Sequence, residues 1–328
     1  MYSAIDNHLD TLVNTKSTPL QELSADWLSQ KTVRLFVKRD DLLSFPDAPE
    51  FRGNKWRKMK YNLLAAKQEG HHTILTFGGA YSNHIAATAA AGKLFGFRTI
   101  GIIRGEETLP LNPTLRRAKE NGMRLHYVTR KDYRKKKETD FNRWLHQLFG
   151  SFYTVPEGGS NALALRGCQE LGTEIRLQVE DKKPLYVTSA CGTGGTFAGL
   201  ITAFDKTTHA IGFPALKGDF MEREIRLFLE TYQHSSTASW TINNNFHFGG
   251  FAKFQPALIT FMQEFYDAFQ IPLDPLYTGK MFYGLKELIQ DGYFPKGANI
   301  VAVHTGGLQG IAGFNRRYGL SLPNKKPL

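Results

Sequence analysis

Residues Leu185–Leu200 read LYVTSACGTGGTFAGL, and this stretch decides the fold. It begins with a short apolar run at Leu185–Thr188, passes through the glycine-rich turn Ser189–Thr196 and ends in the apolar residues Phe197–Leu200. Glycine lets a backbone turn tightly and approach a ligand, and the free N–H groups of a first helical turn face an anion. The stretch therefore predicts a buried strand that enters a helix through an anion-binding turn, in which two threonine hydroxyls add donors.

A second junction has the same design. The apolar run Thr73–Phe77 is followed by the turn Gly78–His84 (GGAYSNH) and by an alanine-rich helix. Two such turns in one chain can hold two anions, such as a phosphate and a carboxylate. A glycine-rich turn between a strand and a helix also occurs where tight packing alone requires it, and this alternative stays open for either turn taken singly.

Two nucleotide-binding patterns do not fit the first turn. A P-loop needs a lysine followed by serine or threonine after its last glycine, and GTGGTFAG has neither at that point. The dinucleotide pattern GxGxxG fails because Phe197 stands where the third glycine belongs.

Short apolar, β-branched runs alternate with helical patterns along the chain. The expected strands are Val33–Val37, Thr73–Phe77, Thr99–Ile103, Arg124–Val128, Leu185–Thr188, His209–Phe213 and Ile300–Val303. The expected helices include Trp56–Gln68, His84–Phe95, Thr114–Asn121, Phe141–Leu148 and Ala162–Gln178. This alternation predicts an α/β protein with mostly parallel sheets covered by helices on both faces. Such sheets bind ligands at the carboxyl ends of their strands.

Length and composition limit the class of protein. The 328 residues suit two domains, or one large α/β unit, at about 150 residues per domain. Hydrophobic residues make up 41% and charged residues 22%, which supplies a core and argues against disorder. No apolar run reaches the roughly 18 residues that cross a bilayer, and we expect no signal peptide. Only Cys168 and Cys191 occur, which excludes a disulfide scaffold and predicts a cytoplasmic protein.

The net charge is +11, from 41 Lys and Arg against 30 Asp and Glu. Such an excess occurs in nucleic-acid binders, in proteins that bind anionic substrates and in proteins with a merely basic surface. The densest run, Arg130–Lys137 (RKDYRKKK), predicts a solvated helix face. No nucleic-acid-binding motif is visible, so this class is kept as an alternative. No histidine has a partner at metal-ligand spacing, and we expect no metal.

Lys55 stands at the start of the expected helix Trp56–Gln68. Other cations lie nearby in the sequence at Arg52, Arg57 and Lys58. The positive end of the helix dipole and these cations disfavour the ammonium form and lower the pKa of the lysine. A neutral lysine near an anion-binding turn is what Schiff-base chemistry requires. Taken alone, however, a lysine in a basic stretch is usually a surface residue.

Five ordered motifs identify a family resemblance. They are Phe51-Arg52-Gly53-Asn54-Lys55-x-Arg57-Lys58, Gly78-Gly79-x-x-Ser82-Asn83-His84, Thr193-Gly194-Gly195-Thr196, Asp274-Pro275-x-Tyr277-x-Gly279-Lys280 and His304-Thr305-Gly306-Gly307. From about Lys38 to the C-terminus, the chain resembles the 1-aminocyclopropane-1-carboxylate deaminase/D-cysteine desulfhydrase family of pyridoxal-phosphate enzymes. The resemblance implies the tryptophan synthase β-like fold, with two three-layer α/β/α domains. Residues 54–154 would form the small domain, and 1–53 with 155–328 the large cofactor-binding domain. A homodimer is also expected.

The resemblance also implies which residues hold pyridoxal 5′-phosphate. Lys55, next to Asn54 in the cofactor site, would form the Schiff base with the cofactor and move the substrate's Cα proton. Asn83 would bind the phenolic oxygen of the cofactor, and Thr305 would meet its pyridine nitrogen. The phosphate would lie on the turn formed by Thr193, Gly194, Gly195 and Thr196.

A threonine hydroxyl at the pyridine nitrogen, unlike a carboxylate, does not force protonation of that nitrogen. The ring is then a weaker electron sink, which favours the departure of a group from Cβ soon after deprotonation. We therefore expect β-elimination from a small amino acid, with release of a keto acid and ammonia. D-cysteine, which would also release sulfide, is the first candidate substrate. Deamination of 1-aminocyclopropane-1-carboxylate is the alternative.

The resemblance assigns further residues to the substrate. Ser82 would contact the substrate carboxylate or its leaving side, and Tyr277 would lie against cofactor and substrate as a proton donor or as a guard of the pyridine face. The expected substrate-binding residues are Tyr81, Ser82, Asn83, His84 and Phe248.

Some positions depart from the family pattern. Thr278 stands where the deaminases have glutamate, and His84 where they have glutamine, and both agree with the desulfhydrase branch. Tyr81 replaces a usual glutamine beside Ser82. Phe248 with Gly249 is the best match to a Tyr-Gly segment of both branches, so a phenol would be missing. That loss leaves a cofactor-binding protein with little turnover as a further alternative.

Overall fold

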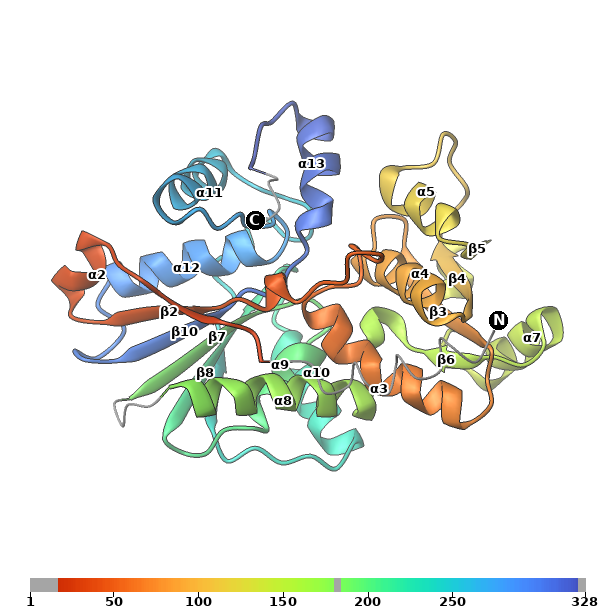
Figure 1. Ribbon diagram of the computed structural model, residues 1–328, viewed down its shortest axis with the longest axis horizontal. Coiled ribbons are helices and arrows are strands. Elements are labelled where there is room, and N and C mark those ends of the chain that lie inside the picture. Colours follow the sequence, from red (N-terminus) through yellow and green to blue (C-terminus); the bar gives the residue numbers. More distant parts are fainter. Residues whose placement is uncertain (1–16, 180–183, 324–328) are drawn as a thin grey trace.

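The computed structural model describes residues 17–179 and 184–323, which form two β-sheets flanked by helices (Figure 1). The six-stranded sheet has the order β1-β2-β10-β7-β8-β9, and the four-stranded sheet has the order β5-β4-β3-β6. All strand pairs are parallel except β1 with β2. The strands are β1 (Leu20–Leu23), β2 (Arg34–Lys38), β3 (Thr73–Gly79), β4 (Arg98–Arg104), β5 (Arg124–Val128), β6 (Tyr153–Val155), β7 (Leu185–Cys191), β8 (Thr208–Pro214), β9 (Ser239–Ile242) and β10 (Asn299–Val303).

Helices connect most of these strands. They are α2 (Asp26–Lys31), α3 (Asn54–Gln68), α4 (Asn83–Phe95), α5 (Pro113–Glu120), α6 (Arg130–Tyr133), α7 (Thr139–Phe149), α8 (Ala162–Gln178), α9 (Gly195–Ile201), α10 (Met221–Thr231), α11 (Pro256–Phe269), α12 (Thr278–Gln290) and α13 (Ile311–Tyr318). Short 3-10 helices occur at η1 (Asp40–Leu42), η2 (Glu157–Gly159) and η3 (Leu308–Gly310).

Each sheet is covered on both faces, and its central strands β3, β7 and β10 are accordingly buried along most of their length. In Figure 1, α11, α12 and α13 lie on one side of the six-stranded sheet and α8, α9 and α10 on the other. The side chains of β10 alternate accordingly. Ile300 packs in the core under α11 and α12, and Val301 packs in the core that includes residues of α8 and α9. The α/β architecture with mostly parallel sheets is therefore confirmed.

The predicted strands and helices recur in the structure with small shifts at their ends. The strands β1, β6 and β9 were not predicted, and they are short and partly exposed. The prediction of a helix over Arg130–Lys137 was too long, because α6 has only four residues and a turn follows it. The division into domains stays a prediction. The strand β6, which pairs with β3, ends at Val155, one residue beyond the predicted boundary.

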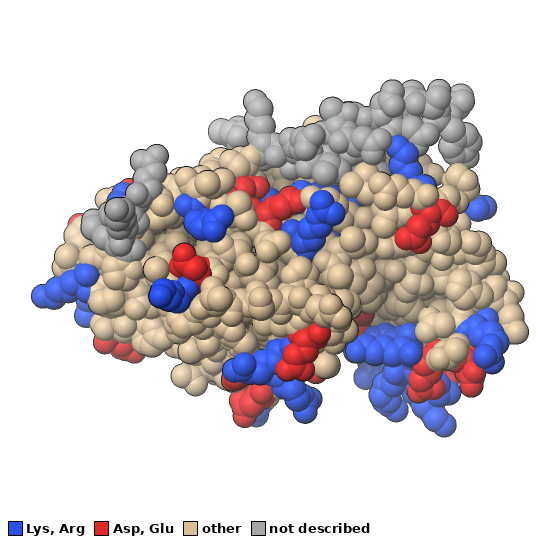
Figure 2. Space-filling model, turned by 90° about the horizontal axis from the view of Figure 1, so that it is seen from below, with Lys and Arg blue, Asp and Glu red and all other residues tan. Residues whose placement is uncertain are grey.

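The basic surface is balanced by acids in several places. Figure 2 shows Lys and Arg side chains standing beside Asp and Glu side chains on the face viewed from below. Within the predicted basic run, Lys135 pairs with Asp132 at 2.8 Å and Lys136 with Glu157 at 3.3 Å. None of the helices in residues 17–179 and 184–323 has both the length and the apolar character that a bilayer crossing needs.

Helix α3 is fixed between the two sheets by a buried charge network. Arg57 on α3 pairs with Asp40, which follows β2, at 2.7 Å, and also with Glu174 on α8. Lys38 pairs with the same Glu174 at 2.8 Å. The helices α3 and α8 approach closely, because a Cβ on Gly167 would come within 1.9 Å of the Arg57 carbonyl oxygen. The network therefore sets the position of the first turns of α3.

Replacing Asp40 should destabilise the protein strongly. Asp40→Asn leaves the buried Arg57 with one carboxylate in place of two, and breaking a buried pair costs about 3 kcal/mol or more. Urea unfolding of Asp40→Asn measures the loss, with Asp26→Asn on the exposed part of α2 as the control. A change below about 0.5 kcal/mol, as expected for a surface pair, would contradict the role given to the network.

Candidate active site

The carboxyl ends of strands from both sheets meet at one place. A Cβ on Gly158, which follows β6, would lie 2.7 Å from Cγ2 of Thr193, which follows β7. A Cβ on Gly307, which follows β10, would lie 3.6 Å from the Nδ2 atom of Asn83 at the start of α4. A Cβ on the adjacent Gly159 would lie 3.0 Å from Cε1 of His84. The two turns that the sequence singled out therefore both border the Gly158–Gly159 segment, which follows β6.

The start of α3 is hydrogen-bonded to both flanking loops. The Asn54 N–H donates to the Thr305 carbonyl oxygen at 3.2 Å, and its side-chain Nδ2 donates to Thr196 Oγ1 at 3.2 Å. Gly53 has a φ of +55°, and a Cβ there would come within 2.4 Å of the Thr305 carbonyl oxygen. Only glycine permits this approach. Asn54, the residue before Lys55, is therefore held by hydrogen bonds to both the buried Thr305 and Thr196.

Lys55 lies in the first turn of α3 and is partly buried. Its amine makes no hydrogen bond or ion pair with any residue that the structure describes. Burial lowers the pKa of Lys55 to about 8, and Cys168 and Asp274 oppose this effect only in part. Lys55 therefore carries a neutral amine more often than an exposed lysine does. The direction of the pKa shift agrees with the sequence prediction, but its cause is burial and not the neighbouring cations that the sequence suggested.

Lys58, one turn further along α3, is 2% exposed. Its Nζ donates to Ser160 Oγ at 2.7 Å and to Thr193 Oγ1 at 3.5 Å, and it has no carboxylate partner in the described part of the chain. Burial, and the neighbouring Lys55, lower the pKa of Lys58 to about 7. A buried amine bound only by hydroxyls lacks a counter-ion, and it therefore favours an anion at this position.

The turn at 193–196 lies directly against Lys58 and Ser160. A Cβ on Gly195 would lie 2.6 Å from Ser160 Oγ and 3.3 Å from Lys58 Nζ, so glycine allows the backbone of the turn to approach both groups. Gly194 has a φ of +80°, which lets the backbone turn at the start of α9. Lys58 and two hydroxyls thus converge on the backbone of the predicted phosphate turn.

Helix α4 presents Ser82, Asn83 and His84 at its first turn. Ser82 Oγ accepts the N–H groups of His84 and Ile85 at 3.2 and 3.3 Å and so caps the helix. Its hydroxyl hydrogen remains able to donate to a ligand. Tyr81, by contrast, is 53% exposed.

His84 is a buried, neutral imidazole. The Thr76 hydroxyl donates to the Val155 carbonyl oxygen at 2.8 Å, so it must accept from His84 Nε2, also at 2.8 Å. Burial, with Lys55 and Lys58 nearby, lowers the pKa of His84 well below its usual range. His84 Nδ1 is then a buried acceptor for which the described residues supply no donor.

Tyr277 closes the site from the six-stranded sheet. Its ring lies against Gly192, where a Cβ would come within 3.0 Å of the ring. Burial raises the pKa of Tyr277, and the nearby Asp274 and Glu157 raise it further. Asp274 accepts the N–H groups of Leu276, Tyr277 and Thr278, which fixes the start of α12. Tyr277 therefore keeps its proton at neutral pH.

Two phenylalanines compete for the position beside Tyr277. Phe248 packs on Tyr283 with ring centroids 5.0 Å apart and lies, partly buried, against the core of the six-stranded sheet. Phe251 lies 6.1 Å from the Tyr277 ring and is 43% exposed. The residues that follow the two phenylalanines both have positive φ, +88° at Gly249 and +58° at Ala252, so the ring contact and not the backbone distinguishes them. Phe251, which the sequence interpretation missed, is thus the residue next to Tyr277.

The comparison with known families decides the class. A family profile described as "Pyridoxal-phosphate dependent enzyme" matches residues 12–306. The chain belongs to this family.

Relatives and solved structures agree with this membership. An Arabidopsis thaliana protein named "Bifunctional D-cysteine desulfhydrase/1-aminocyclopropane-1-carboxylate deaminase, mitochondrial" is 29% identical over 318 residues, which cover 90% of this chain and 77% of that protein. A solved structure described as "Crystal Structure Analysis of the ACC deaminase homologue" has a TM-score of 0.76 at 26% identity and covers 97% of this chain and 98% of its own. A hydrogen sulfide-producing enzyme from Fusobacterium nucleatum, with a TM-score of 0.62 at 13% identity over 93% of this chain and 98% of that one, shows the fold alone.

The residues present fit the cofactor of this pyridoxal-phosphate-dependent family. A phosphate supplies the counter-ion that the buried Lys58 lacks, and the backbone of the 193–196 turn lies close to the Lys58 amine because Gly195 has no side chain. The unpartnered amine of Lys55 lies one turn of α3 away. The sequence had noted Lys58 only as a nearby cation, because its partner Ser160 is 102 residues away. The spacing of three residues between the two lysines is the signal that places both on one helix face.

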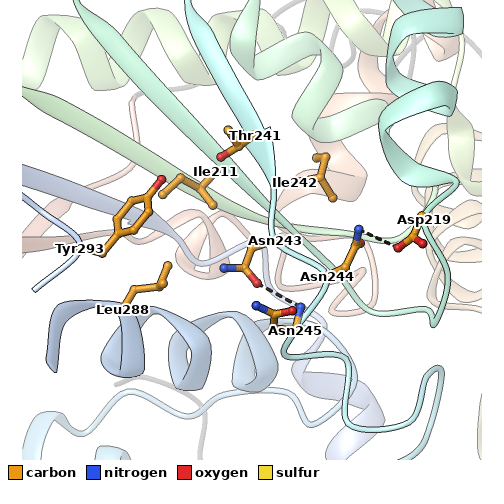
Figure 3. Close-up of a pocket in the computed structure, with 9 residues that line it drawn as sticks. All are labelled: Ile211, Asp219, Thr241, Ile242, Asn243, Asn244, Asn245, Leu288 and Tyr293. Carbon is orange, nitrogen blue, oxygen red and sulfur yellow. Dashed lines mark hydrogen bonds between the residues drawn. The ribbon is translucent and has the colours of Figure 1, made fainter. Parts of the chain in front are cut away.

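A separate cavity of about 420 Å³ lies at the end of β9 (Figure 3). Asn243, Asn244 and Asn245 line it together with Tyr293, and Asn244 donates to Asp219. None of the predicted site residues lines this cavity.

Removing the Lys58 amine should weaken the retention of pyridoxal phosphate. Lys58→Met keeps the apolar stem but deletes the charged donor, and a hydrogen bond to a charged group contributes roughly 1.5–3 kcal/mol. The dissociation constant should rise by about tenfold or more in an absorbance titration. Lys93→Met, at an exposed position of α4, is the matched control. An unchanged constant in Lys58→Met would place the phosphate elsewhere.

Proposed function

We propose that this pyridoxal-phosphate-dependent enzyme eliminates a group from Cβ of a small amino acid, with D-cysteine as the first substrate. The observation that carries the proposal is the unpartnered Lys55 amine, which lies one turn of α3 from the Lys58–Ser160–Thr193 cradle. The similarity to the bifunctional Arabidopsis protein supports this type of activity. In the net reaction, the amino acid and water give a keto acid, ammonia and the protonated leaving group.

Residues of both sheets would hold the cofactor. Lys58, Thr193 and Thr196 would bind its phosphate, and Asn83 and Thr305 would bind its ring. When bound, pyridoxal phosphate draws electrons from the Cα of an amino acid joined to it and so acidifies the Cα proton. Lys55 would accept this proton, because a pKa of about 8 leaves a useful share of neutral amine near neutral pH.

Residues around Lys55 would orient the substrate. Ser82 would donate its free hydroxyl hydrogen to the substrate carboxylate at the start of α4. Tyr277 would keep its proton, because its pKa is raised, and would present it to the leaving group. Both groups are held by backbone contacts, Ser82 as the cap of α4 and Tyr277 through the turn around Asp274. Little reorganisation would be needed when substrate binds.

Thr278 favours the desulfhydrase activity over deamination of 1-aminocyclopropane-1-carboxylate. Its hydroxyl donates to the Asp274 carboxylate at 2.8 Å and is fully buried. At the position where the deaminases carry glutamate, this chain therefore has a residue that hydrogen-bonds Asp274 and stabilises the turn before α12. Deamination of 1-aminocyclopropane-1-carboxylate remains the second candidate, since the Arabidopsis relative is named for both activities. A homodimer and a cytoplasmic location belong to the same proposal.

A product assay tests the substrate. The protein loaded with pyridoxal phosphate should release sulfide and pyruvate from D-cysteine faster than it releases keto acid from 1-aminocyclopropane-1-carboxylate. Lys55→Ala should reduce either activity by at least about a thousandfold, because proton transfer and covalent attachment are both lost. L-cysteine is run in parallel to establish the stereochemistry. Equal activity of Lys55→Ala and the wild type would overturn the proposal.

The aromatic position beside Tyr277 gives a second test. Phe251→Tyr should change kcat for D-cysteine by about threefold or more, since a phenol then stands near Tyr277 and the substrate. Phe248→Tyr, at a partly buried position next to Tyr283, should leave kcat unchanged and lower stability slightly. The reverse pattern would show that Phe248, as the sequence predicts, faces the substrate.

A further inference from the structure

Arg104 extends over the turn that leads to Ser82. It is the last residue of β4, and in the parallel register it stands opposite Gly79, the last residue of β3. Its Nη2 atom lies 3.5 Å from the position that a Cβ on Gly79 would take. The guanidinium therefore lies at the carboxyl end of the four-stranded sheet, beside the segment that starts at Gly79 and caps α4 at Ser82.

This guanidinium has no carboxylate partner. Arg104 is exposed and forms no ion pair with any residue in 17–179 or 184–323. Its guanidinium also lies over the buried ring of Tyr133, whose centroid is 5.6 Å from the Arg104 Cζ. Glu106 and Glu107 follow in the chain, but both are exposed and neither pairs with it. An arginine held over a ring and left without an acid is ready to bind an anion.

The other charges around Tyr133 are already matched. Lys136 lies 4.8 Å from the centre of the same ring and pairs with Glu157 at 3.3 Å. Glu157 also raises the pKa of Tyr277, which places this group of charges near the six-stranded side of the site. Two cations thus stand beside one carboxylate, and Arg104 is the surplus positive charge at this edge of the site.

We propose that Arg104 is a specificity-determining residue, which extends the substrates of this site beyond D-cysteine to amino acids that carry a second negative charge on the side chain. The inference rests on the proposed function, in which Ser82 holds the substrate carboxylate. With the carboxylate held there, the side chain of the substrate would extend toward Arg104. A carboxylate, a sulfonate or a phosphate ester would each suit the fork of the guanidinium. For O-phosphoserine, the Cβ–O bond breaks, its electron pair leaves with phosphate, and Cα loses a proton. With one water, the products are pyruvate, ammonia and phosphate.

A matched pair of substrates tests the charge preference. O-phosphoserine and β-chloroalanine, each as both enantiomers, yield the same pyruvate and ammonia, but only O-phosphoserine carries the extra charge. Arg104→Gln should lower kcat/KM for O-phosphoserine by about tenfold or more and leave β-chloroalanine within about twofold. Arg104→Lys should recover part of the loss. Arg98→Gln, exposed at the opposite end of β4, should alter neither substrate. Equal losses for both substrates, or no loss, would overturn the inference.

A binding measurement separates this inference from the proposed function. O-phosphoserine should raise the Tm of the loaded wild-type protein more than serine does, and Arg104→Gln should remove this difference while Arg98→Gln keeps it. If no compound releases pyruvate, the proposed elimination fails, and the difference in Tm still decides the role of Arg104. The same Tm shift in the wild type and in Arg104→Gln would contradict that role.

Discussion

Two lysine amines share one face of α3, and no carboxylate among residues 17–179 and 184–323 pairs with either of them. The site depends on this arrangement. Removing charged groups from water costs several kcal/mol per ion unless a partner compensates. Burial therefore lowers the pKa of Lys55 to about 8 and that of Lys58 to about 7. The neutral form of Lys55 supplies a nucleophile, and the hydroxyl-bound Lys58 gains a counter-ion when a phosphate binds. One physical constraint thus accounts for both halves of the cofactor site.

The rest of the fold holds α3 in place to maintain this constraint. Arg57, on the same helix, is bound by Asp40 and Glu174. Its charge is therefore matched by carboxylates, whereas the charges of Lys55 and Lys58 are not. Close packing of α8 at Gly167 fixes the helix from the other side. The carboxyl ends of β3 and β7 then meet over the first turn of α3, and neither sheet alone contains the site.

The central strands and both glycine-rich turns could be predicted from the sequence, because strands buried on both faces are continuous apolar runs. The strands β1, β6 and β9 could not, since they are short edge strands with half-exposed side chains. Lys55 was found through its neighbours in sequence and through the family motif. The partner of Lys58 depends on a contact 102 residues away, and the choice between Phe248 and Phe251 depends on how the loop after β9 folds. Contacts between distant segments determine these two features, and the local sequence pattern does not reveal them.

The most direct measurement of the central claim is the pH dependence of covalent labelling at Lys55. Cofactor-free protein is mixed with pyridoxal phosphate across pH 6–11, reduced briefly with borohydride and digested, and the labelled peptides are quantified by mass spectrometry. Because the neutral amine reacts and the folded-state pKa is lowered, labelling of Lys55 should rise with a midpoint near pH 8 and saturate well before exposed lysines react. A midpoint near 10.5, or preferential labelling of another lysine, would contradict a buried and unpaired Lys55 amine.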